Sequence, residues 1–159
     1  MKKRVLPILA ALAPYLMVCA FLFVIRFTPE LLSLVSPLLL YGLILSLGPA
    51  LGVVCLVFGL RSASPALAAK WNLFVKLTHI PFYIVILLLS FWVMPLFAPF
   101  FFFLDAAVLL LSSGFGIAAA LRARKEGQAT TGWAVLHILL HCCFVLDVIS
   151  AFLIRKKLR

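Results

Sequence analysis

The stretch of the sequence that decides the fold is residues 99–154, which read PFFFFLDAAVLLLSSGFGIAAALRARKEGQATTGWAVLHILLHCCFVLDVISAFLI. Two apolar runs of membrane-spanning length flank a short basic turn between Arg122 and Gly127. Asp105 lies in the first run and Asp147 in the second. Because carboxylates are costly in lipid, an acid inside such a run is a candidate functional residue. The stretch therefore predicts a helical membrane hairpin that carries two intramembrane acids.

The composition of the whole chain indicates the same class of protein. Of the 159 residues, 67% are hydrophobic, and the mean hydropathy is +1.29. A soluble domain has only about 45–50% apolar residues. The net charge of +10 comes from Lys and Arg at the ends of apolar runs, which is typical of membrane interfaces and not of nucleic-acid binding. We therefore predict a multi-pass protein of the cell membrane, in contact with the lipid bilayer and without a nucleic-acid partner.

The apolar runs predict an all-α bundle of five transmembrane helices, with four crossing helices as the alternative. The whole chain, residues 1–159, forms one membrane domain with helices expected at residues 5–26, 34–60, 73–95, 99–121 and 131–154. Pro95 and Pro99 separate the third helix from the fourth, because one continuous run would be too long for a single crossing. Gly48 and Gly52 have the spacing that lets two helices approach closely in lipid. Lys76 is expected to extend its ammonium to the headgroup level.

The distribution of Lys and Arg predicts a cytoplasmic N-terminus. With five crossings, nine basic residues lie inside: Lys2, Lys3, Arg4, Arg61, Lys70, Lys76, Arg122, Arg124 and Lys125. The other five lie outside: Arg26, Arg155, Lys156, Lys157 and Arg159. An external basic C-terminus opposes the rule. Packing of the last helix against its neighbour, a predicted span that does not cross, or an antiparallel dimer of both orientations would each account for it.

The two acids define a predicted polar layer inside the membrane. Asp105 and Ser112 share a face of the fourth predicted helix, and Cys143 and Asp147 share a face of the fifth, at 100° per residue. Both acids lie at a similar depth, so we expect them to meet inside the bundle with Arg26 above them. The layer either holds the helices in register through hydrogen bonds or relays protons or cations.

Three histidines form a second predicted polar layer, His79, His137 and His141. His137 and His141 have the i,i+4 spacing of zinc-binding helices, but Ile138 stands where the glutamate of an HExxH site would follow the first histidine. We therefore expect hydrogen-bonded core histidines, with no metal and no other cofactor. The four cysteines, Cys19, Cys55, Cys142 and Cys143, form no CxxC pair and are interpreted as small buried hydrophobic residues.

The C-terminal stretch SSGFGI…LHILLHCCFVLDVIS, residues 112–150, resembles the final hairpin of an uncharacterised family of small multi-pass membrane proteins of Firmicutes. In that family a serine–glycine patch precedes a basic turn, and an LH..FxLDVIS-like run closes the chain. The segment LTHIPFYI, residues 77–84, is similar to the central helix of the same family. The resemblance implies a helical membrane architecture and brings no activity, ligand or catalytic residue with it.

The sequence contains no nucleotide-binding motif and no catalytic spacing, so we expect no enzymatic activity and no catalytic residues. The predicted function is that of an interaction or accessory subunit, which packs against another membrane protein or a second copy of itself. The alternative is a small proton- or cation-linked transporter or channel that uses Asp105 and Asp147.

Overall fold

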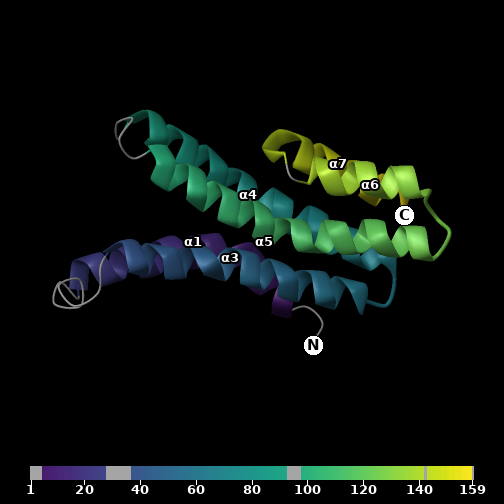
Figure 1. Ribbon diagram of the computed structural model, residues 1–159, viewed down its shortest axis with the longest axis horizontal. Coiled ribbons are helices and arrows are strands. Elements are labelled where there is room, and N and C mark those ends of the chain that lie inside the picture. The colour runs from purple at the N-terminus through teal and green to yellow at the C-terminus, as the bar shows by residue number, and fades with distance from the viewer. Residues whose placement is uncertain (1–4, 28–36, 93–97, 142, 159) are drawn as a thin grey trace.

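The computed structural model describes residues 5–27, 37–92, 98–141 and 143–158. Their secondary structure is entirely α-helical: α1 (Val5–Phe27), α3 (Pro37–Leu60), α4 (Pro65–Trp92), α5 (Ala98–Lys125), α6 (Thr131–Leu140) and α7 (Phe144–Lys157). Four long helices, α1, α3, α4 and α5, form an elongated bundle, and the two short helices lie against one end of it (Figure 1). The described part of the chain is therefore an all-α helix bundle, as predicted.

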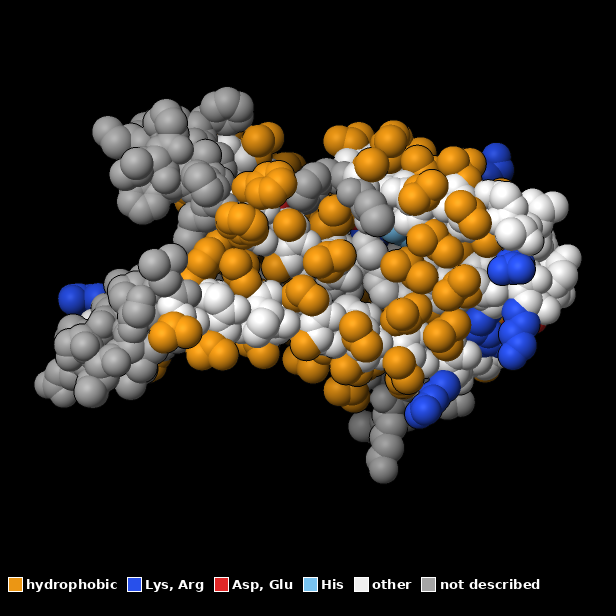
Figure 2. Space-filling model, viewed as in Figure 1, with side chains coloured by type: hydrophobic (Ala, Val, Ile, Leu, Met, Phe, Trp, Pro, Cys, Tyr) orange, Lys and Arg blue, Asp and Glu red, His pale blue; other side chains and the backbone are white. Residues whose placement is uncertain are grey.

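Three of these helices are long and apolar enough to cross a membrane. The candidate spans in the described residues are Tyr41–Leu60, Pro65–Leu88 and Phe101–Lys125, and α1 contributes a shorter apolar stretch, Val5–Ala20. Large hydrophobic side chains cover the outside of the bundle between its two ends (Figure 2). An apolar outer surface fits a membrane protein, since the hydrocarbon of a bilayer accepts exposed apolar side chains that water would not.

Helices α3 and α5 pack backbone to backbone through glycine. A Cβ on Gly48 would lie 2.7 Å from the carbonyl oxygen of Ala107, and one on Gly52 would lie 2.6 Å from that of Leu110. Both distances are too short for a real side chain, so the close approach depends on these two glycines. The small-residue spacing predicted from the sequence therefore lies at a helix–helix contact.

Helix α4 begins eight residues earlier than predicted, at Pro65 in place of residue 73. The Ser64 side chain caps it, because the Leu67 amide donates to Ser64 Oγ at 3.2 Å. Proline at the first helical position needs no amide hydrogen bond. The segment after Arg61 that was expected to be a polar connection is therefore mostly helix, and Lys76 lies about 16 Å along α4 at 1.5 Å per residue.

The single helix predicted over residues 131–154 is instead two antiparallel helices, which we call the C-terminal hairpin (α6 and α7). Trp133 in the first turn of α6 contacts Lys157 in the last turn of α7, with Nζ 4.8 Å from the ring centroid. Halfway along, His137 Nδ1 and Ser150 Oγ are 2.7 Å apart. With 10 and 14 residues, the helices are about 15 and 21 Å long, shorter than the hydrocarbon core of about 30 Å. The hairpin thus returns to the end from which it started.

The reversal brings the basic C-terminal end beside the start of α4. Arg155 Nη1 donates to the Ala66 carbonyl at 3.1 Å, and Ile154 and Leu158 pack into an alanine-rich cluster from α4 and α5. The predicted placement of Lys157 at the opposite end of the bundle from Arg61 and Lys70 therefore does not match the structure.

The charge asymmetry of the bundle is clear in space (Figure 2). One end carries Arg61, Lys70, Arg122, Arg124, Lys125, Arg155, Lys156 and Lys157. Among the described residues, Arg26 is the one basic side chain at the other end. The basic C-terminal residues thus lie at the same end of the bundle as all the described basic surface residues except Arg26.

Candidate functional site

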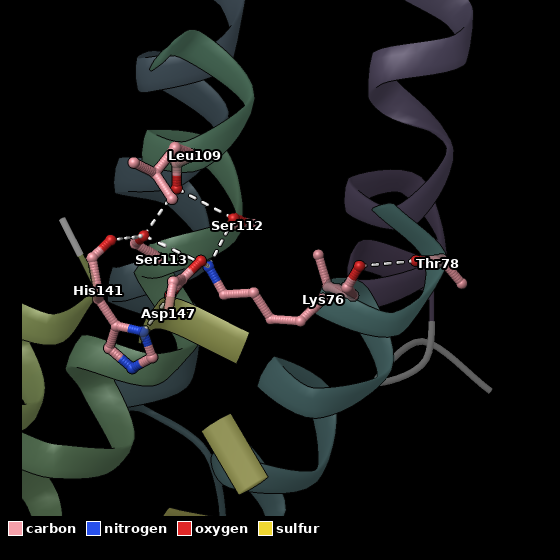
Figure 3. Close-up of polar contacts among 8 residues, drawn as sticks. Lys76, Thr78, Leu109, Ser112, Ser113, His141 and Asp147 are labelled. Atoms are coloured by element: carbon pink, nitrogen blue, oxygen red, sulfur yellow. Dashed lines mark hydrogen bonds and ion pairs between the residues drawn. The ribbon is translucent and has the colours of Figure 1, made fainter. Parts of the chain in front are cut away.

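The candidate site is a buried group of charged and polar side chains between α4, α5 and the tip of the C-terminal hairpin (Figure 3). We call it the Lys76 cluster; it consists of Lys76, Ser112, Ser113, His141 and Asp147. Each of the five residues is at most 4% exposed. Lys76 Nζ forms an ion pair with Asp147 Oδ2, and His141 Nδ1 contacts the other carboxylate oxygen, Oδ1. The carboxylate therefore has a nitrogen partner on each oxygen.

The lysine ammonium also has oxygen partners on α5. Lys76 Nζ donates to Ser112 Oγ at 2.6 Å and lies 3.5 Å from Ser113 Oγ. Ser112 Oγ is 3.0 Å from the Leu109 carbonyl, and Ser113 Oγ lies 2.7 Å from that carbonyl and 2.9 Å from the His141 carbonyl. A hydroxyl has a single proton, and the carbonyls accept it, so both serines present lone pairs to the ammonium.

The break between α6 and α7 is built around these contacts. The sequence has neither Gly nor Pro between His137 and Asp147. Instead, Ser113 on α5 donates to the His141 carbonyl, the carbonyl of the residue that follows α6. Asp147 lies in the first turn of α7, where the positive end of the helix dipole favours a carboxylate. Tertiary polar contacts, rather than a local breaker residue, therefore fix the tip of the hairpin.

Gly116 on α5 makes room for the His141 ring. A Cβ at this position would overlap Nε2, Cε1 and Cδ2 of His141. The backbone of α5 thus lies directly against the imidazole. The hairpin tip depends on Gly116 as well as on the charges.

The structure separates the predicted acid layer. Asp147 lies with Lys76, Ser112 and His141 in the cluster, whereas Asp105 lies two turns before Ser112 on α5, about 10 Å along the helix. Asp105 is half-buried, and its Oδ1 has no hydrogen-bond partner among the described residues. Asp147 reaches a different depth from the expected one because α7 runs opposite to the continuous helix assumed for the prediction.

The other members of that layer are not in the cluster. Arg26 and Cys143 are both exposed. Cys143 occupies the N-cap position of α7, where its side chain forms no capping hydrogen bond. Of the four predicted buried cysteines, Cys55 is buried and Cys19 is exposed. Cys142 lies outside the described residues.

The predicted histidine layer is also divided. His141 belongs to the Lys76 cluster, His137 pairs with Ser150, and the Nε2 atom of His79 lies 3.1 Å from the Ala10 carbonyl of α1. His137 packs against Trp133 with 4.3 Å between the ring centroids. In the part of the chain that the structure describes, no group of three or more His, Cys, Asp or Glu side chains could hold a metal ion.

Lys76 is the site residue that sequence reasoning missed. Its predicted place at the headgroups followed from the late start assigned to its helix. A signal was present, because Asn72, Lys76, His79 and Tyr83 fall on one stripe of α4 at spacings of four, three and four. Four polar side chains on one stripe of an apolar helix indicate an inward polar face rather than a single snorkelling lysine.

Several buried polar atoms near the cluster lack a hydrogen-bond partner among the described residues. They are Oδ1 and Nδ2 of Asn72, Nδ1 of His79, Nε2 of His141 and Oδ1 of Asp105. Asn72 and Tyr83 mark the ends of the polar stripe on α4, about 16 Å apart along the helix. Buried polar atoms of this kind are normally satisfied by internal water or an ion.

Residues 5–159 match the family of unknown function DUF6652, so the chain belongs to this family. Neither a curated protein nor a solved structure matches the chain.

Proposed function

We propose that the protein is a small, non-enzymatic transporter of the cell membrane that moves protons or monovalent cations past the Lys76 cluster. The observation that carries this proposal is the burial of the Lys76–Asp147 ion pair between the C-terminal hairpin and two membrane-length helices, α4 and α5. Ionisable side chains at this depth are expensive and typically mark an ion or proton path. Of the two acids considered from the sequence, Asp147 has the central role, and Asp105 lies further along the same interior.

The C-terminal hairpin supports a transport function. Helix ends and non-helical backbone within a bilayer are tolerated where they are buried in protein or line a polar path. The end of α6 and the start of α7 meet at the Lys76 cluster, where the helix dipole of α7 faces the carboxylate. Discontinuous helices of this type form the ion and substrate sites of many transporters.

The unpaired polar atoms extend this interior beyond the cluster. Asn72 lies one turn from Lys76 toward the basic end, and Asp105 lies about two turns from Ser112 toward the other end. Water molecules that satisfy Asn72, His79 and Asp105 would form a file on both sides of the cluster. Such a file would connect the ion pair to both membrane surfaces.

We further propose that α1, α3, α4 and α5 cross the membrane, with the C-terminal hairpin entering from the cytoplasmic side. Four crossings, the alternative to the five predicted, place eight described basic residues inside and Arg26 outside. The N-terminus is then cytoplasmic. The resemblance to small multi-pass membrane proteins supports a helical membrane architecture.

Flux measurements in liposomes test the transport function. Purified protein in vesicles with an internal pH-sensitive dye should dissipate an imposed pH gradient faster than empty vesicles. The change Asp147→Asn should reduce this rate at least tenfold while the protein stays folded, because an amide cannot carry the charge of the carboxylate. Glu126→Gln, the same change at the exposed Arg122–Glu126 pair, serves as the control and should leave the rate unchanged. A native rate equal to that of empty vesicles, for protons and for alkali cations, would refute the proposal.

An accessory subunit is the second candidate, favoured by a stripe of small residues on α3. Gly42, Ser46 and Ala50 are exposed at four-residue spacing, and a Cβ on Gly42 would meet nothing within 4 Å. Stripes of this kind allow close helix association in lipid. The partner would be another membrane protein or a second copy of the chain. Co-purification of a stoichiometric partner that Gly42→Leu releases, without any flux, would favour this function over transport.

A further inference from the structure

An apolar groove runs between α1 and α3, two helices that lie side by side (Figure 1). Its walls come from residues 9–20 of α1 and residues 44–54 of α3, Leu111 of α5 lies at its base, and every lining side chain is apolar. Leu16 and Leu47, on opposite walls, are 54% and 57% exposed, so the groove is open to the outside of the bundle. Its volume of about 460 Å³ is within the range of ligand pockets, about 300–1,000 Å³.

A smaller hollow lies at the basic end of the bundle, where α3 ends. Its volume is about 90 Å³, and its lining includes Phe58, Arg61 and Ser62. Arg61 is exposed, and its amide donates to the Val57 carbonyl at 3.1 Å, so helical geometry continues from α3 to this residue. The Nη1 atom of Arg122 on α5 lies 3.0 Å from Ser62 Oγ, which places a second guanidinium beside the hollow. The hollow is therefore cationic.

The groove and the hollow lie on one face of α3. Leu47, Leu51 and Val54 line the groove, and Phe58 and Arg61 line the hollow. These five residues follow one another at spacings of four, three, four and three, which places them within an arc of about 80° at 100° per residue. Val54 and Arg61 are separated by about 10 Å along the helix axis. This face of α3 thus presents an apolar groove and then, nearer the basic end, a guanidinium.

We infer, on the basis of the four-crossing arrangement proposed above, that this face of α3 binds an anionic phospholipid of the membrane. One acyl chain lies in the groove, and the phosphate lies in the hollow beside Arg61. In that arrangement the groove is at the depth of the hydrocarbon, and the hollow is at the membrane surface. The 10 Å between Val54 and Arg61, a value of about seven residues of helix, leaves room for the glycerol and ester groups.

The charge at this end of the bundle selects the headgroup. Among the described residues, Glu126 is the one acid at this end, against eight basic residues. Lys and Arg at the membrane surface attract anionic lipids, and basic pockets between membrane helices bind their headgroups. The chain contributes little to the choice between lipids, because the groove and the bilayer are both apolar. The specificity therefore comes from the phosphate and from the absence of a cationic group on the lipid.

The site is separate from the other features already described. None of the five residues of the Lys76 cluster lines the groove or the hollow. Of the stripe of small residues on α3, Ala50 lines the groove, whereas Gly42 and Ser46 do not. A second copy of the chain in the same orientation would bring another basic end against Arg61, and like charges oppose such a contact. A lipid with a negative headgroup has the complementary charge.

The experiment is native mass spectrometry of the full-length protein in detergent, titrated with dioleoyl phosphatidylglycerol or with dioleoyl phosphatidylcholine. The two lipids have the same chains and differ in the charge of the headgroup. One basic residue at the membrane surface corresponds to about a fivefold difference in affinity. Phosphatidylglycerol should therefore bind at least about fivefold more tightly than phosphatidylcholine. Equal affinities for the two lipids would overturn the inference.

Two variants test the two parts of the site. Arg61→Gln should weaken phosphatidylglycerol binding about fivefold and leave phosphatidylcholine binding unchanged. Ala50→Leu puts a larger side chain into the groove and should weaken binding of both lipids about fivefold or more, as overpacking does. Both residues are exposed, so both variants should fold.

Matched controls separate the site from general charge and surface effects. Lys70→Gln removes an exposed charge at the same end but outside the hollow, and Cys19→Leu enlarges an exposed residue of α1 outside the groove. Both should bind the lipids as the native protein does. An equal loss of phosphatidylglycerol binding in Lys70→Gln and Arg61→Gln, or unchanged binding in Ala50→Leu, would overturn the inference.

The same spectra report the oligomeric state. A dimer that Ala50→Leu dissociates, without any phosphatidylglycerol adduct, would place a second copy in the groove and overturn the inference. Liposome flux and cysteine labelling test the transport function and the crossings independently. A protein that transports ions with four crossings but binds the two lipids equally would overturn the lipid site alone. Selective phosphatidylglycerol binding that depends on Arg61, in a protein without flux, would support the lipid site and refute transport.

Discussion

Replacing Lys76 with methionine removes an ammonium that is 0% exposed and leaves the carboxylate of Asp147, 1% exposed, without its cation. Breaking a buried ion pair by removing one partner costs about 3–5 kcal/mol of stability. His141 Nδ1 remains as a partner of Oδ1, so we expect a value near the lower limit, about 3 kcal/mol. The apolar stem of methionine fills much of the space of the lysine stem, which keeps cavity formation small.

The double change Lys76→Met with Asp147→Leu provides the comparison. Replacing both charges with apolar groups is often neutral or stabilising, by about 1–4 kcal/mol. The double variant should therefore be more stable than Lys76→Met alone. Asp147→Leu alone should be strongly destabilised for the same reason as Lys76→Met.

Reversible unfolding in mixed micelles with increasing SDS, followed by circular dichroism, measures these free energies. A coupling energy above about 2 kcal/mol between the two positions is expected for a buried, interacting pair. A coupling energy below about 1 kcal/mol, the range of exposed pairs, would refute the reasoning that Lys76 and Asp147 form a buried, interacting ion pair.

Two further predictions concern the hairpin. Gly116→Ala places a Cβ on the His141 ring, and this overpacking should destabilise the protein by about 1–3 kcal/mol. Gly132→Ala is the control, because a Cβ there meets nothing within 4 Å. In the same unfolding assay, Gly132→Ala should be neutral or slightly stabilising. Single cysteines at Ser64 and Lys157, in a background without native cysteines, should both resist an impermeant thiol reagent in intact cells, whereas a cysteine at Arg26 should react. Labelling at Lys157 but not at Ser64 would contradict the hairpin and would support a last helix that crosses the membrane.

Much of the architecture could be predicted from apolar run length, since helices in lipid need a minimum number of apolar residues. The bundle, the glycine contact of α3 with α5 and the start of α6 after Thr130 follow from local sequence. The reversal after Leu140 does not, because no Gly or Pro marks it. It depends on contacts with Ser113 and Lys76, which lie far away in the sequence.

The site was predictable in its components but not in its pairing. Asp147, Ser112 and His141 were all candidates from the sequence, yet Asp147 was paired with Asp105 and Arg26. That pairing assumed a continuous last helix, and the depth of every residue after His141 changes when the helix reverses. The predicted position of Lys76 was wrong for a similar reason. Helix α4 starts earlier than predicted, and this places Lys76 in the interior of the bundle rather than at the membrane interface. The depth predicted for a residue in a membrane helix is only as accurate as the predicted position of the helix end.

The return of the C-terminal hairpin to its starting side has a consequence for biogenesis. A full crossing would carry Arg155, Lys156 and Lys157 through the bilayer, at about 2.5–3.5 kcal/mol for each charge at the centre. In the proposed topology, with the hairpin entering from the cytoplasmic side, these residues stay on the side on which they are synthesised. Asp147 lies in the interior of the bundle, where it forms an ion pair with Lys76. In the proposed topology, the hairpin therefore docks onto α4 and α5 without moving its basic C-terminal residues across the bilayer.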